Sequence, residues 1–547
     1  MRSVDYSIYL VTGRDLLPPG KDFLTSLEES IQGGVTLVQL REKELDTQTF
    51  IDLAIRSKAI CDKYNVPFLI NDRIDVALIA KTDGVHIGQT DMSVEQARSL
   101  LPAGSIIGLS CTSVEHIREA VRLNVDYVGI GPVWGTQTKK LSNPIIGVRG
   151  VGAMLAELDG TNIKAVAISG IKSTNLLRTL HGSMSQTNHA LDGIAVVSEI
   201  VASADPRSAA QKLKSIFSEF KRAYTPHPLG FPQALTGTDT NGPGKSIAPS
   251  ADSIMDGVVC LMNEIRKANP LVHQITNAVV TTQSANVTLA IGASPIMATE
   301  PQEMEDLARI SGALLINIGS MRAETVDGIG LAGTFANSFR KPVVFDPVGV
   351  GASTFRKSSV RTLLDTFQSS VIKGNAGELA ALAGTTEVES KGVDSVGPGF
   401  KDPANFVRNL AKRERCIVVL SGPVDYVSDG VSVVALANGH ELLGHITGSG
   451  CILGSCIASY CATASQVAQA DPNIENGGIF RGDMFTAAIA GVLVLTVAAE
   501  LAVKSGDVKG LIDALWSLSP EQVREMSRLT VSKAIHQQEL RVYCGAE

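Results

Sequence analysis

Residues 84–131 read GVHIGQTDMSVEQARSLLPAGSIIGLSCTSVEHIREAVRLNVDYVGIG, in which three short apolar runs alternate with stretches of helical character. This alternation is typical of parallel strands joined by helices. The pattern continues on both sides and gives eight candidate strands. Eight βα repeats within about 200 residues predict a (β/α)8 TIM barrel, which carries its chemistry at the C-terminal ends of its strands. The candidate strands are residues 9–12, 37–40, 68–70, 84–87, 106–109, 127–131, 164–168 and 193–197.

A different pattern begins after Ser253. Longer helical stretches separate apolar runs such as residues 313–319, 341–351 and 416–422. Near-continuous apolar strands are expected when a mostly parallel sheet is covered by helices on both faces. We therefore predict an open α/β/α sandwich that binds its ligands at the carboxyl ends of its strands.

A linker separates the two patterns. Residues 224–250 read YTPHPLGFPQALTGTDTNGPGKSIAPS and are rich in proline and glycine without an apolar period. This composition is typical of a linker. The predicted organisation is a barrel over residues 1–223, a linker over residues 224–252 and a sandwich over residues 253–547.

Composition and charge exclude several classes of protein. The chain of 547 residues is 44% hydrophobic and 19% charged, with a net charge of −7. It has no basic block that would follow a phosphate backbone, so we expect no nucleic-acid partner. Only sixteen uncharged residues stand between Asp483 and Glu500, too few to span a bilayer comfortably. We interpret this run as a buried core helix and expect no membrane association.

The cysteines point to a reducing compartment. The eight cysteines contain no Cys-x-x-Cys pair, and the N-terminal residues lack the apolar stretch of a signal peptide. Free thiols are therefore the expectation, and a cytoplasmic location follows from it.

Charged side chains gather after the strands of the predicted barrel. Arg41 and Lys43 follow the second strand, Asp72 the third, Asp91 the fourth and Lys139 the sixth. The carboxylates can hold Mg²⁺, which prefers oxygen ligands shared with substrate phosphates. The cations can neutralise a diphosphate. Each residue alone would be read as a solvated surface charge, but five of them at successive strand ends favour a binding site.

The order of motifs in this half resembles thiamine-phosphate synthase over nearly all of residues 5–220. The matching stretches are QLREK (39–43), ND (71–72), GVHIGQTD, GPVWGTQTK and GIAVVSEI. One departure is Ser169 in Ser-Gly-Ile, where that family usually has Gly-Gly-Ile. It affects the fit around a thiazole phosphate.

The resemblance implies specific roles for residues of the barrel. Mg²⁺ would be held by Asp72 and Asp91. The aminopyrimidine diphosphate would be bound by Gln39, Leu40, Arg41, Glu42, Lys43, Asn71, Ser110 and Lys139. The thiazole phosphate would be bound by Thr136, Gln137, Thr138, Gly170, Val197 and Ser198. Charge on the departing diphosphate would be stabilised by the cations and Mg²⁺, and no general base is needed.

In the second half, Thr447-Gly-Ser-Gly-Cys451 precedes a strongly apolar run and predicts a loop that opens onto a helix. The first turn of a helix exposes unpaired N–H groups and the positive end of the dipole, which suit a phosphoryl group. A thiol at this place should have a lowered pKa and be able to accept a proton from a hydroxyl group.

Two other interpretations of Cys451 compete with this one. A small cysteine with apolar neighbours is commonly a core residue. A metal site with Cys456 and Cys461 is disfavoured, because a spacing of five residues rotates each helical thiol by about 140° from the last.

Residues 255–545 resemble hydroxyethylthiazole kinase, a member of the ribokinase-like group. The matching stretches are PLVHQITNAVV (270–280), LAIGASPIM (289–297), DPVGVGAS, IKGNAGELAALAG and TGSGC. The resemblance implies that Cys451 accepts the proton. It also implies contacts of Met297 and Gly448 with the thiazole alcohol, and of Lys373 and Ser421 with ATP. We further assign Asp346 and Glu378 to the organisation of Mg²⁺.

Together the resemblances imply a thiamine biosynthetic enzyme with two activities, of the fungal type. Its partners would be small molecules: the pyrimidine diphosphate, hydroxyethylthiazole and its phosphate, and ATP. The kinase resemblance also implies a homo-oligomer. An aldolase-type barrel is disfavoured because Lys164, the candidate Schiff-base lysine, precedes its strand. A binding or scaffold protein that has lost its chemistry is the remaining alternative.

Overall fold

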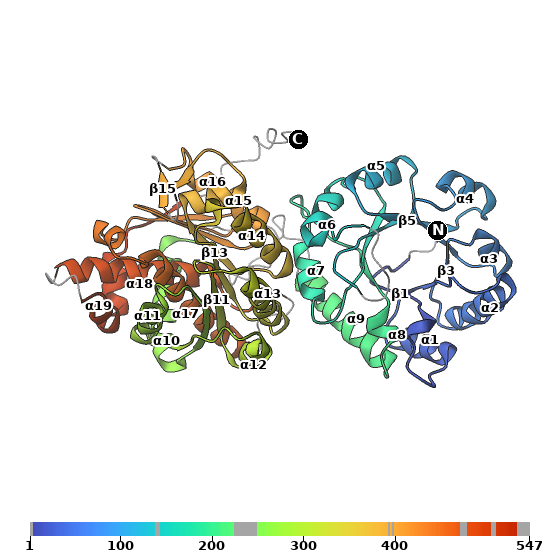
Figure 1. The fold of residues 1–547 in the computed structure, drawn as a ribbon, viewed down its shortest axis with the longest axis horizontal. Helices are drawn as coiled ribbons and strands as arrows, with labels where there is room; N and C mark the ends of the chain where they lie inside the picture. Colours follow the sequence, from blue (N-terminus) through green and yellow to red (C-terminus); the bar gives the residue numbers. More distant parts are fainter. Residues whose placement is uncertain are drawn as a thin grey trace. The chain divides into compact units, whose positions relative to one another are not determined.

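The computed structural model describes residues 4–136, 143–223, 249–391, 394–396, 399–470, 478–504 and 510–532. The chain divides into two compact units, each with its own sheet (Figure 1). Most of the predicted linker lies outside the described residues, so its boundaries stay a prediction.

The N-terminal unit is a closed barrel of eight strands in chain order, all parallel to their neighbours. The predicted barrel is therefore confirmed, and every candidate strand corresponds to one observed strand. The strands are β1 (Ile8–Val11), β2 (Leu37–Leu40), β3 (Phe68–Asn71), β4 (Gly84–Ile87), β5 (Ile106–Cys111), β6 (Tyr127–Ile130), β7 (Lys164–Ile168) and β8 (Gly193–Val196).

Helices surround the barrel strands (Figure 1). Several begin at a polar residue whose side chain accepts a hydrogen bond from the first turn, as Asp22, Asp46, Ser93 and Ser113 do. The helices are η1 (Arg14–Leu16), α1 (Phe23–Gln32), α2 (Thr47–Lys63), α3 (Ile74–Ile79), α4 (Val94–Leu100), α5 (Val114–Arg122), α6 (Gly147–Ala156), α7 (Leu176–Gly182), α8 (Ser198–Val201) and α9 (Pro206–Ala223).

The C-terminal unit is built on a sheet of nine strands in the order β10-β9-β11-β12-β13-β16-β17-β18-β19. The pairs from β10 to β16 are parallel and those from β16 to β19 are antiparallel. The strands are β9 (Leu271–Ile275), β10 (Ser294–Ile296), β11 (Ala313–Asn317), β12 (Val343–Asp346), β13 (Val371–Asn375), β16 (Ile417–Ser421), β17 (Asp425–Ser428), β18 (Val433–Leu436) and β19 (Leu529–Ser532), and a separate pair is formed by β14 (Glu389–Lys391) and β15 (Asp394–Val396).

Helices cover both faces of this sheet, which confirms the predicted sandwich. In β11, Leu315 belongs to one buried cluster and Leu314 to another, because successive side chains point to opposite faces. The first face packs on α10 (Ala251–Ala268), α11 (Thr281–Ile291), α17 (Ser449–Ala470), α18 (Met484–Lys504), α19 (Leu511–Ser517) and α20 (Pro520–Met526). The second packs on α12 (Met304–Ile310), α13 (Ala323–Ser338), α14 (Thr354–Thr366), α15 (Ala376–Ala383) and α16 (Pro403–Glu414). Short helices are η2 (Pro301–Glu303), η3 (Val350–Ala352) and η4 (Glu441–His445).

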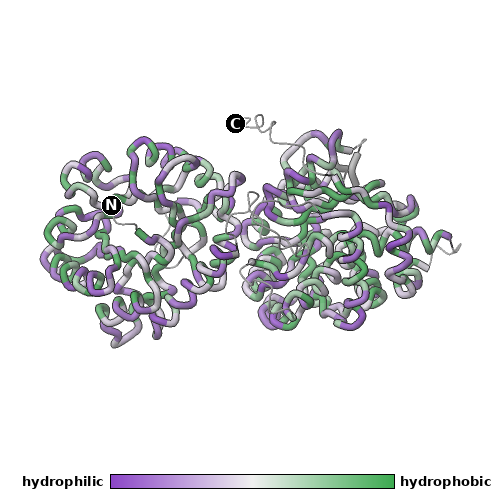
Figure 2. Tube along the Cα trace, turned by 180° about the vertical axis from the view of Figure 1, so that it is seen from behind, coloured by the Kyte–Doolittle hydropathy of each residue, from purple (hydrophilic) through white to green (hydrophobic). Residues whose placement is uncertain are grey.

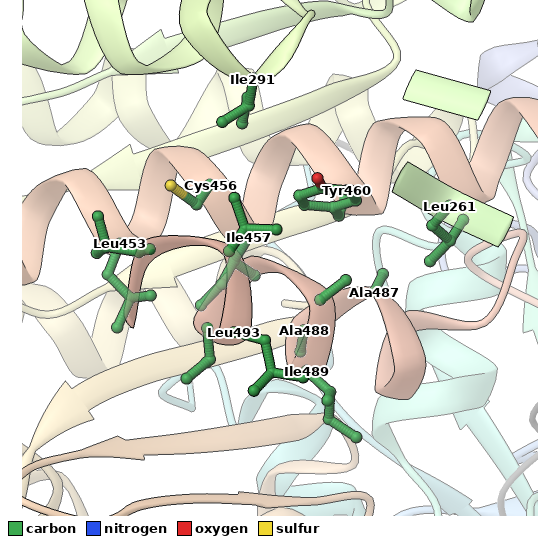
Figure 3. Close-up of a cluster of buried hydrophobic side chains, with 14 of the residues drawn as sticks. Leu261, Ile291, Leu453, Cys456, Ile457, Tyr460, Ala487, Ala488, Ile489 and Leu493 are labelled. Carbon is green, nitrogen blue, oxygen red and sulfur yellow. The ribbon is translucent and has the colours of Figure 1, made fainter. Parts of the chain in front are cut away.

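The helices α17 and α18 form the centre of the first core. Both are long and apolar enough to cross a membrane by length and composition, but 83% and 89% of their most apolar windows are buried inside the unit. The predicted buried helix after Asp483 is therefore confirmed as α18. Ile457 of α17 points towards Ala488 and Leu493 of α18, whereas Cys456 and Tyr460 lie on the side of α17 that faces Ile291 (Figure 3). The hydropathy view likewise has hydrophobic segments in the middle of this unit and hydrophilic ones around it (Figure 2).

Candidate functional sites at the strand ends

A cavity of about 590 Å³ lies at the C-terminal ends of the barrel strands. Most of the polar residues that were predicted to follow the barrel strands line this cavity. The predicted residues that line it are Gln39, Arg41, Lys43, Asn71, Asp72, Asp91, Ser110, Thr136, Gly170, Val197 and Ser198.

Other predicted residues are placed differently. Leu40 is fully buried and does not line the cavity, so any contact with a ligand there depends on its backbone. Glu42 also lies outside the lining, and its carboxylate accepts a hydrogen bond from Arg14 Nε at 2.8 Å. Gln137, Thr138 and Lys139 lie outside the described residues.

Two carboxylates from neighbouring strands meet at this cavity. Asp72 Oδ2 accepts a hydrogen bond from Lys43 Nζ at 2.7 Å, and Asp91 Oδ2 accepts one from the Gly88 N–H at 2.7 Å. Burial and the adjacent Asp72 carboxylate raise the pKa of Asp91. Asp72 also has a φ of 60°, a left-handed conformation that is held by its N–H donating to the His86 carbonyl at 2.9 Å.

This pair suits a divalent cation. Each of two neighbouring carboxylates makes ionisation of the other less favourable, because their negative charges repel. A bound cation would offset this repulsion. Among the residues that the structure describes, no group of three or more His, Cys, Asp or Glu side chains is arranged to hold a metal. Mg²⁺ needs no such group, because it commonly uses one or two carboxylates with water and substrate phosphates.

The turn after β7 explains the glycine preference at the departure noted in the sequence. Ser169 has a φ of 87° and Gly170 a φ of 66°, both in the left-handed region. A Cβ added at Gly170 would lie 2.4 Å from the Gly135 carbonyl oxygen, so this position requires glycine. Ser169 also has a left-handed backbone, and its hydroxyl donates a hydrogen bond to the Trp134 carbonyl at 3.1 Å. Near this turn, α8 begins at Ser198 directly after Val197.

Hydrogen bonds along the cavity wall link side chains from five strands. We call this set the interior chain: Gln39, Tyr9, Tyr127, His86 and Ser110. Gln39 Nε2 donates to the Tyr9 hydroxyl at 2.5 Å, and the hydroxyl groups of Tyr9 and Tyr127 are 2.7 Å apart. His86 Nδ1 lies 2.8 Å from the Tyr127 hydroxyl, and His86 Nε2 lies 2.9 Å from Ser110 Oγ. Burial lowers the pKa of His86 to about 4, so its imidazole is neutral.

Sequence reasoning missed three members of the interior chain. Tyr9 and Tyr127 stand inside apolar runs and were read only as strand residues. His86 stands in the quoted GVHIGQTD motif, where a polar residue inside a strand is a signal that was available.

The structure does not support the aldolase alternative. Lys164 is the first residue of β7, away from the C-terminal end of the strand, and its Nζ pairs with Asp192 at 3.0 Å.

A second polar network lies at the carboxyl ends of β11, β12 and β13. Asn277 Nδ2 donates to Cys451 Sγ at 3.3 Å and to Asn317 Oδ1 at 2.9 Å. Asn317 Nδ2 then donates to Asp346 Oδ2 at 2.8 Å. Lys373 Nζ donates to both Asp346 oxygens at 3.1 Å. The network thus brings together Cys451, Asp346 and Lys373, which the sequence predicted, and Asn277 and Asn317, which it did not.

The predicted loop and helix around Cys451 are confirmed, because α17 begins at Ser449. The predicted lowering of the pKa of Cys451 is wrong. Burial raises the pKa of this thiol, and the nearby Asp346 carboxylate raises it further, against the opposing effects of Lys373 and the asparagine hydrogen bonds. The dipole of the helix start is therefore outweighed by desolvation and a buried negative charge.

Cys451 differs from the other cysteines of its helix. Cys456, which is labelled in Figure 3, is fully buried in the apolar core, and so is Cys461. Cys451, in contrast, is partly exposed and hydrogen-bonded. The core-residue interpretation therefore fits Cys456 and Cys461 but not Cys451.

The remaining predicted kinase residues surround this network. Glu378 is buried, and its carboxylate accepts hydrogen bonds from the N–H groups of Gly349 at 3.0 Å and Asn375 at 2.9 Å. Burial and the Asp346 carboxylate raise the pKa of Glu378 to about 7. Ser421 ends β16, opposite Asn375 of β13.

Gly448 and Met297 are positioned by their local backbone. Gly448 has a φ of 83°, and a Cβ there would lie 2.1 Å from Val280 Cγ1. Glycine is therefore required directly before α17. Met297 is half-buried and follows the edge strand β10.

Comparison with known proteins covers both units. The family described as "Thiamine monophosphate synthase" matches residues 8–200, and the "Hydroxyethylthiazole kinase family" matches residues 262–521. A Schizosaccharomyces pombe protein, "Probable thiamine biosynthetic bifunctional enzyme", is 39% identical over 92% of this chain and 90% of its own length. The Saccharomyces cerevisiae "Thiamine biosynthetic bifunctional enzyme" is 34% identical over 97% and 98%. A Histophilus somni "Hydroxyethylthiazole kinase" is 41% identical over 49% of this chain and 97% of its own.

Proposed function

The chain belongs to the family of bifunctional thiamine biosynthetic enzymes, and from this we propose which residues of its two sites carry the two reactions. The C-terminal unit is a hydroxyethylthiazole kinase, which phosphorylates 4-methyl-5-(2-hydroxyethyl)thiazole with ATP. The N-terminal unit is a thiamine-phosphate synthase. It joins the thiazole phosphate to 4-amino-2-methyl-5-(diphosphooxymethyl)pyrimidine and releases diphosphate.

In the synthase, Arg41 and Lys43 bind the diphosphate of the pyrimidine substrate, together with Lys139 of the predicted set. These cations stabilise the charge that accumulates as the diphosphate leaves, while the electron-rich ring supports the methylene cation. Gln39, Asn71 and Ser110 hold the pyrimidine. The charged and the uncharged groups line the same cavity, so the diphosphate and the pyrimidine ring of one substrate can contact both sets at once.

The thiazole phosphate binds at the other side of the cavity, near Gly170, Val197 and Ser198. A phosphate site formed by the last strand ends and a short extra helix is common in TIM barrels, and α8 is such a helix. Thr136 lines the same cavity, with Gln137 and Thr138 next to it in the sequence. The thiazole nitrogen attacks with its own lone pair, so correct positioning is the main requirement.

Asp72 and Asp91 are the residues that would hold Mg²⁺. Both carboxylates line the cavity, and the raised pKa of Asp91 supports this assignment, because a bound cation would favour the ionised form of its carboxyl group. A bound Mg²⁺ supplies positive charge to the oxygens of the leaving diphosphate. The paired Asp72 and Lys43 then bring both signs of charge to one end of the cavity.

In the kinase, Cys451 accepts the proton of the thiazole alcohol, which Met297 and Gly448 contact. Lys373 and Ser421 bind ATP. An added Cβ at Gly450 would lie 3.6 Å from Lys373 Nζ, so the ammonium group lies beneath the first turn of α17. The exposed N–H groups of that turn and the ammonium together provide positive charge for the phosphoryl group in transfer.

Asp346 and Glu378 are the residues that would help to hold Mg²⁺ in the kinase, where the cation would supply positive charge to the phosphates of ATP. Both carboxylates are buried and already accept hydrogen bonds, Asp346 from Lys373 and Glu378 from backbone N–H groups. Mg²⁺ commonly keeps several of its waters, so an indirect role requires no loss of these bonds.

The cavity that Asp72 and Asp91 line together with Arg41 and Lys43 is the observation that carries the synthase proposal. A coupled assay tests it. The full chain with hydroxyethylthiazole, ATP, the pyrimidine diphosphate and Mg²⁺ should form thiamine phosphate, and chelation of Mg²⁺ should stop the synthase step even when thiazole phosphate is supplied. A scaffold protein would form no product, and a metal-independent barrel would be unaffected by the chelator.

We also propose that the chain is a cytoplasmic homo-oligomer. Large apolar side chains that are exposed on the C-terminal unit support association, among them Val279 at 68% and Ile310 at 63% exposure. All seven cysteines within the described residues are free, as expected in a reducing compartment. Light scattering should give a multiple of the 57.6 kDa chain mass, and a mass of one chain would contradict the proposal.

A further inference from the structure

The interior chain connects two residues that we place against the pyrimidine. Gln39 stands at one end and Ser110 at the other, and Tyr9, Tyr127 and His86 lie between them. Gln39, Tyr9, His86 and Ser110 line the cavity, whereas Tyr127 is fully buried and does not. The chain therefore gives the two contacts a physical connection along the cavity wall, which Tyr127 completes from below.

When the hydroxyl protons of Tyr9 and Tyr127 and the imidazole proton of His86 all donate within this chain, they can be arranged in two ways. The Tyr127 hydroxyl has one proton, and within the described residues its hydrogen-bond partners are Tyr9 and His86. A neutral imidazole has one N–H and one lone pair. If Tyr127 donates to His86 Nδ1, the histidine must donate from Nε2 to Ser110. If Tyr127 donates to Tyr9, the histidine must donate to Tyr127 and accept from Ser110. The hydrogen bonds thus all run in one direction or all in the other.

The direction decides what each end offers to the cavity. In the structure Gln39 Nε2 donates to Tyr9, and when the Tyr9 hydroxyl in turn donates to Tyr127 the bonds run from Gln39 towards Ser110. The amide oxygen of Gln39 is then the acceptor for a ligand, and the Ser110 hydroxyl is the donor. In the reverse direction Gln39 would offer N–H groups and Ser110 would offer an acceptor. The two ends therefore always have opposite character.

An aminopyrimidine matches the first direction, because its amino group donates and its ring nitrogens accept. The corresponding oxopyrimidine has a carbonyl oxygen in place of the amino group and an N–H in the ring, which reverses this pattern. We propose that the interior chain selects an aminopyrimidine over an oxopyrimidine, with Tyr9, Tyr127 and His86 as positioning residues. The proposal rests on the proposed function, in which Gln39 and Ser110 bind the pyrimidine.

The substitution Tyr127→Phe tests this by cutting the chain at a residue that does not contact the ligand. Steady-state rates are measured for the aminopyrimidine diphosphate and its 4-oxo analogue, with saturating thiazole phosphate and Mg²⁺. We expect the preference for the amino substrate, as a ratio of kcat/KM values, to fall by about tenfold, the size of one misdirected hydrogen bond. The loss should come mainly from KM for the pyrimidine, with KM for thiazole phosphate unchanged.

Tyr6→Phe is the matched control. Tyr6 is buried in the same cluster, with its ring centroid 5.1 Å from that of Tyr127, but its hydroxyl is not part of the interior chain. It should keep the wild-type preference, and a Tyr6→Phe variant that loses it would reduce the effect to general core packing.

Two further variants make the result decisive. Tyr9→Phe cuts the same chain elsewhere and should lose the same preference, even if Tyr127→Phe does not fold. Because both changes interrupt one chain, the double variant should lose no more than either single variant. An unchanged preference in Tyr9→Phe or in folded Tyr127→Phe would overturn the inference while leaving the synthase function intact. Absence of thiamine phosphate from the wild-type chain would instead overturn the proposed function.

Discussion

Replacing Cys451 with alanine should lower the kinase turnover of the full chain by about 10²–10⁴-fold, the usual contribution of a positioned proton acceptor. The thiol is held by Asn277 and faces the network that contains Asp346 and Lys373. Loss of the side chain leaves the alcohol proton without this acceptor. Synthase activity in the same chain should be unchanged, which provides an internal measure of folding.

The matched control is Cys456→Ala, one turn and a half further along α17. Cys456 is fully buried in apolar surroundings (Figure 3). Its replacement should lower the free energy of unfolding by about 1 kcal/mol through lost packing and leave kinase turnover unchanged. Equal kinase rates for Cys451→Ala and the wild type would show that Cys451 is not the proton acceptor.

The raised pKa of Cys451 adds a dependence on pH. The thiolate is the form that accepts a proton, and a pKa above the usual value leaves the thiol as the main form at neutral pH. The kinase rate of the wild type should therefore rise as the pH increases through the alkaline range, as the thiolate fraction grows. A kinase rate that falls over this range would show that another group limits the reaction.

Replacing Asp91 with asparagine should lower Mg²⁺-dependent synthase activity by about 10²-fold or more, the size expected for losing a group that stabilises transition-state charge. The amide oxygen can still accept the hydrogen bond from the Gly88 N–H, so the loop should keep its conformation. What is lost is one negative charge next to Asp72. A higher Mg²⁺ concentration should restore part of the activity.

Asp75→Asn is the control for this prediction. Asp75 lies in α3, in the segment after β3 that also carries Asp72, but it is exposed, pairs with Arg73 and does not line the cavity. It should leave both activities and the Mg²⁺ dependence unchanged. If Asp91→Asn removes kinase activity as well, the substitution acts through folding of the whole chain and the metal assignment loses its support.

Much of the architecture could be predicted because the signals are local. Each barrel strand is a short apolar run between helical stretches, so its place follows from neighbours in the sequence. The meeting of Arg41, Asp72 and Asp91 could be predicted for the same reason, since a barrel collects its strand ends at one face.

The parts that sequence reasoning missed depend on distant partners. The Tyr9–Tyr127 hydrogen bond joins residues 118 positions apart on β1 and β6, which are not neighbours in the barrel. Nothing in the sequence next to a tyrosine in an apolar run indicates which distant residue its hydroxyl will bind. Asn277 stands in a motif that was recognised, but its contact with Cys451 joins positions 174 apart.

The error about the pKa of Cys451 has a different cause. A helix start is visible in the sequence, and its dipole lowers the pKa of a thiol by a limited amount. Burial and the Asp346 carboxylate act in the opposite direction, and neither can be read from the residues around Cys451. Predictions of reactivity from local motifs therefore need the charges that the fold brings to them.

The helix α17 gives the kinase site one wall that cannot move independently. It begins at Ser449 above Lys373 and continues into the core against α18 (Figure 3). From Ile452 to Ser465 the residues of α17 are buried in the centre of the hydrophobic core, so the packing of that core fixes the position of the helix that carries the thiol. The stability of the core and the position of the kinase thiol therefore depend on the same helix.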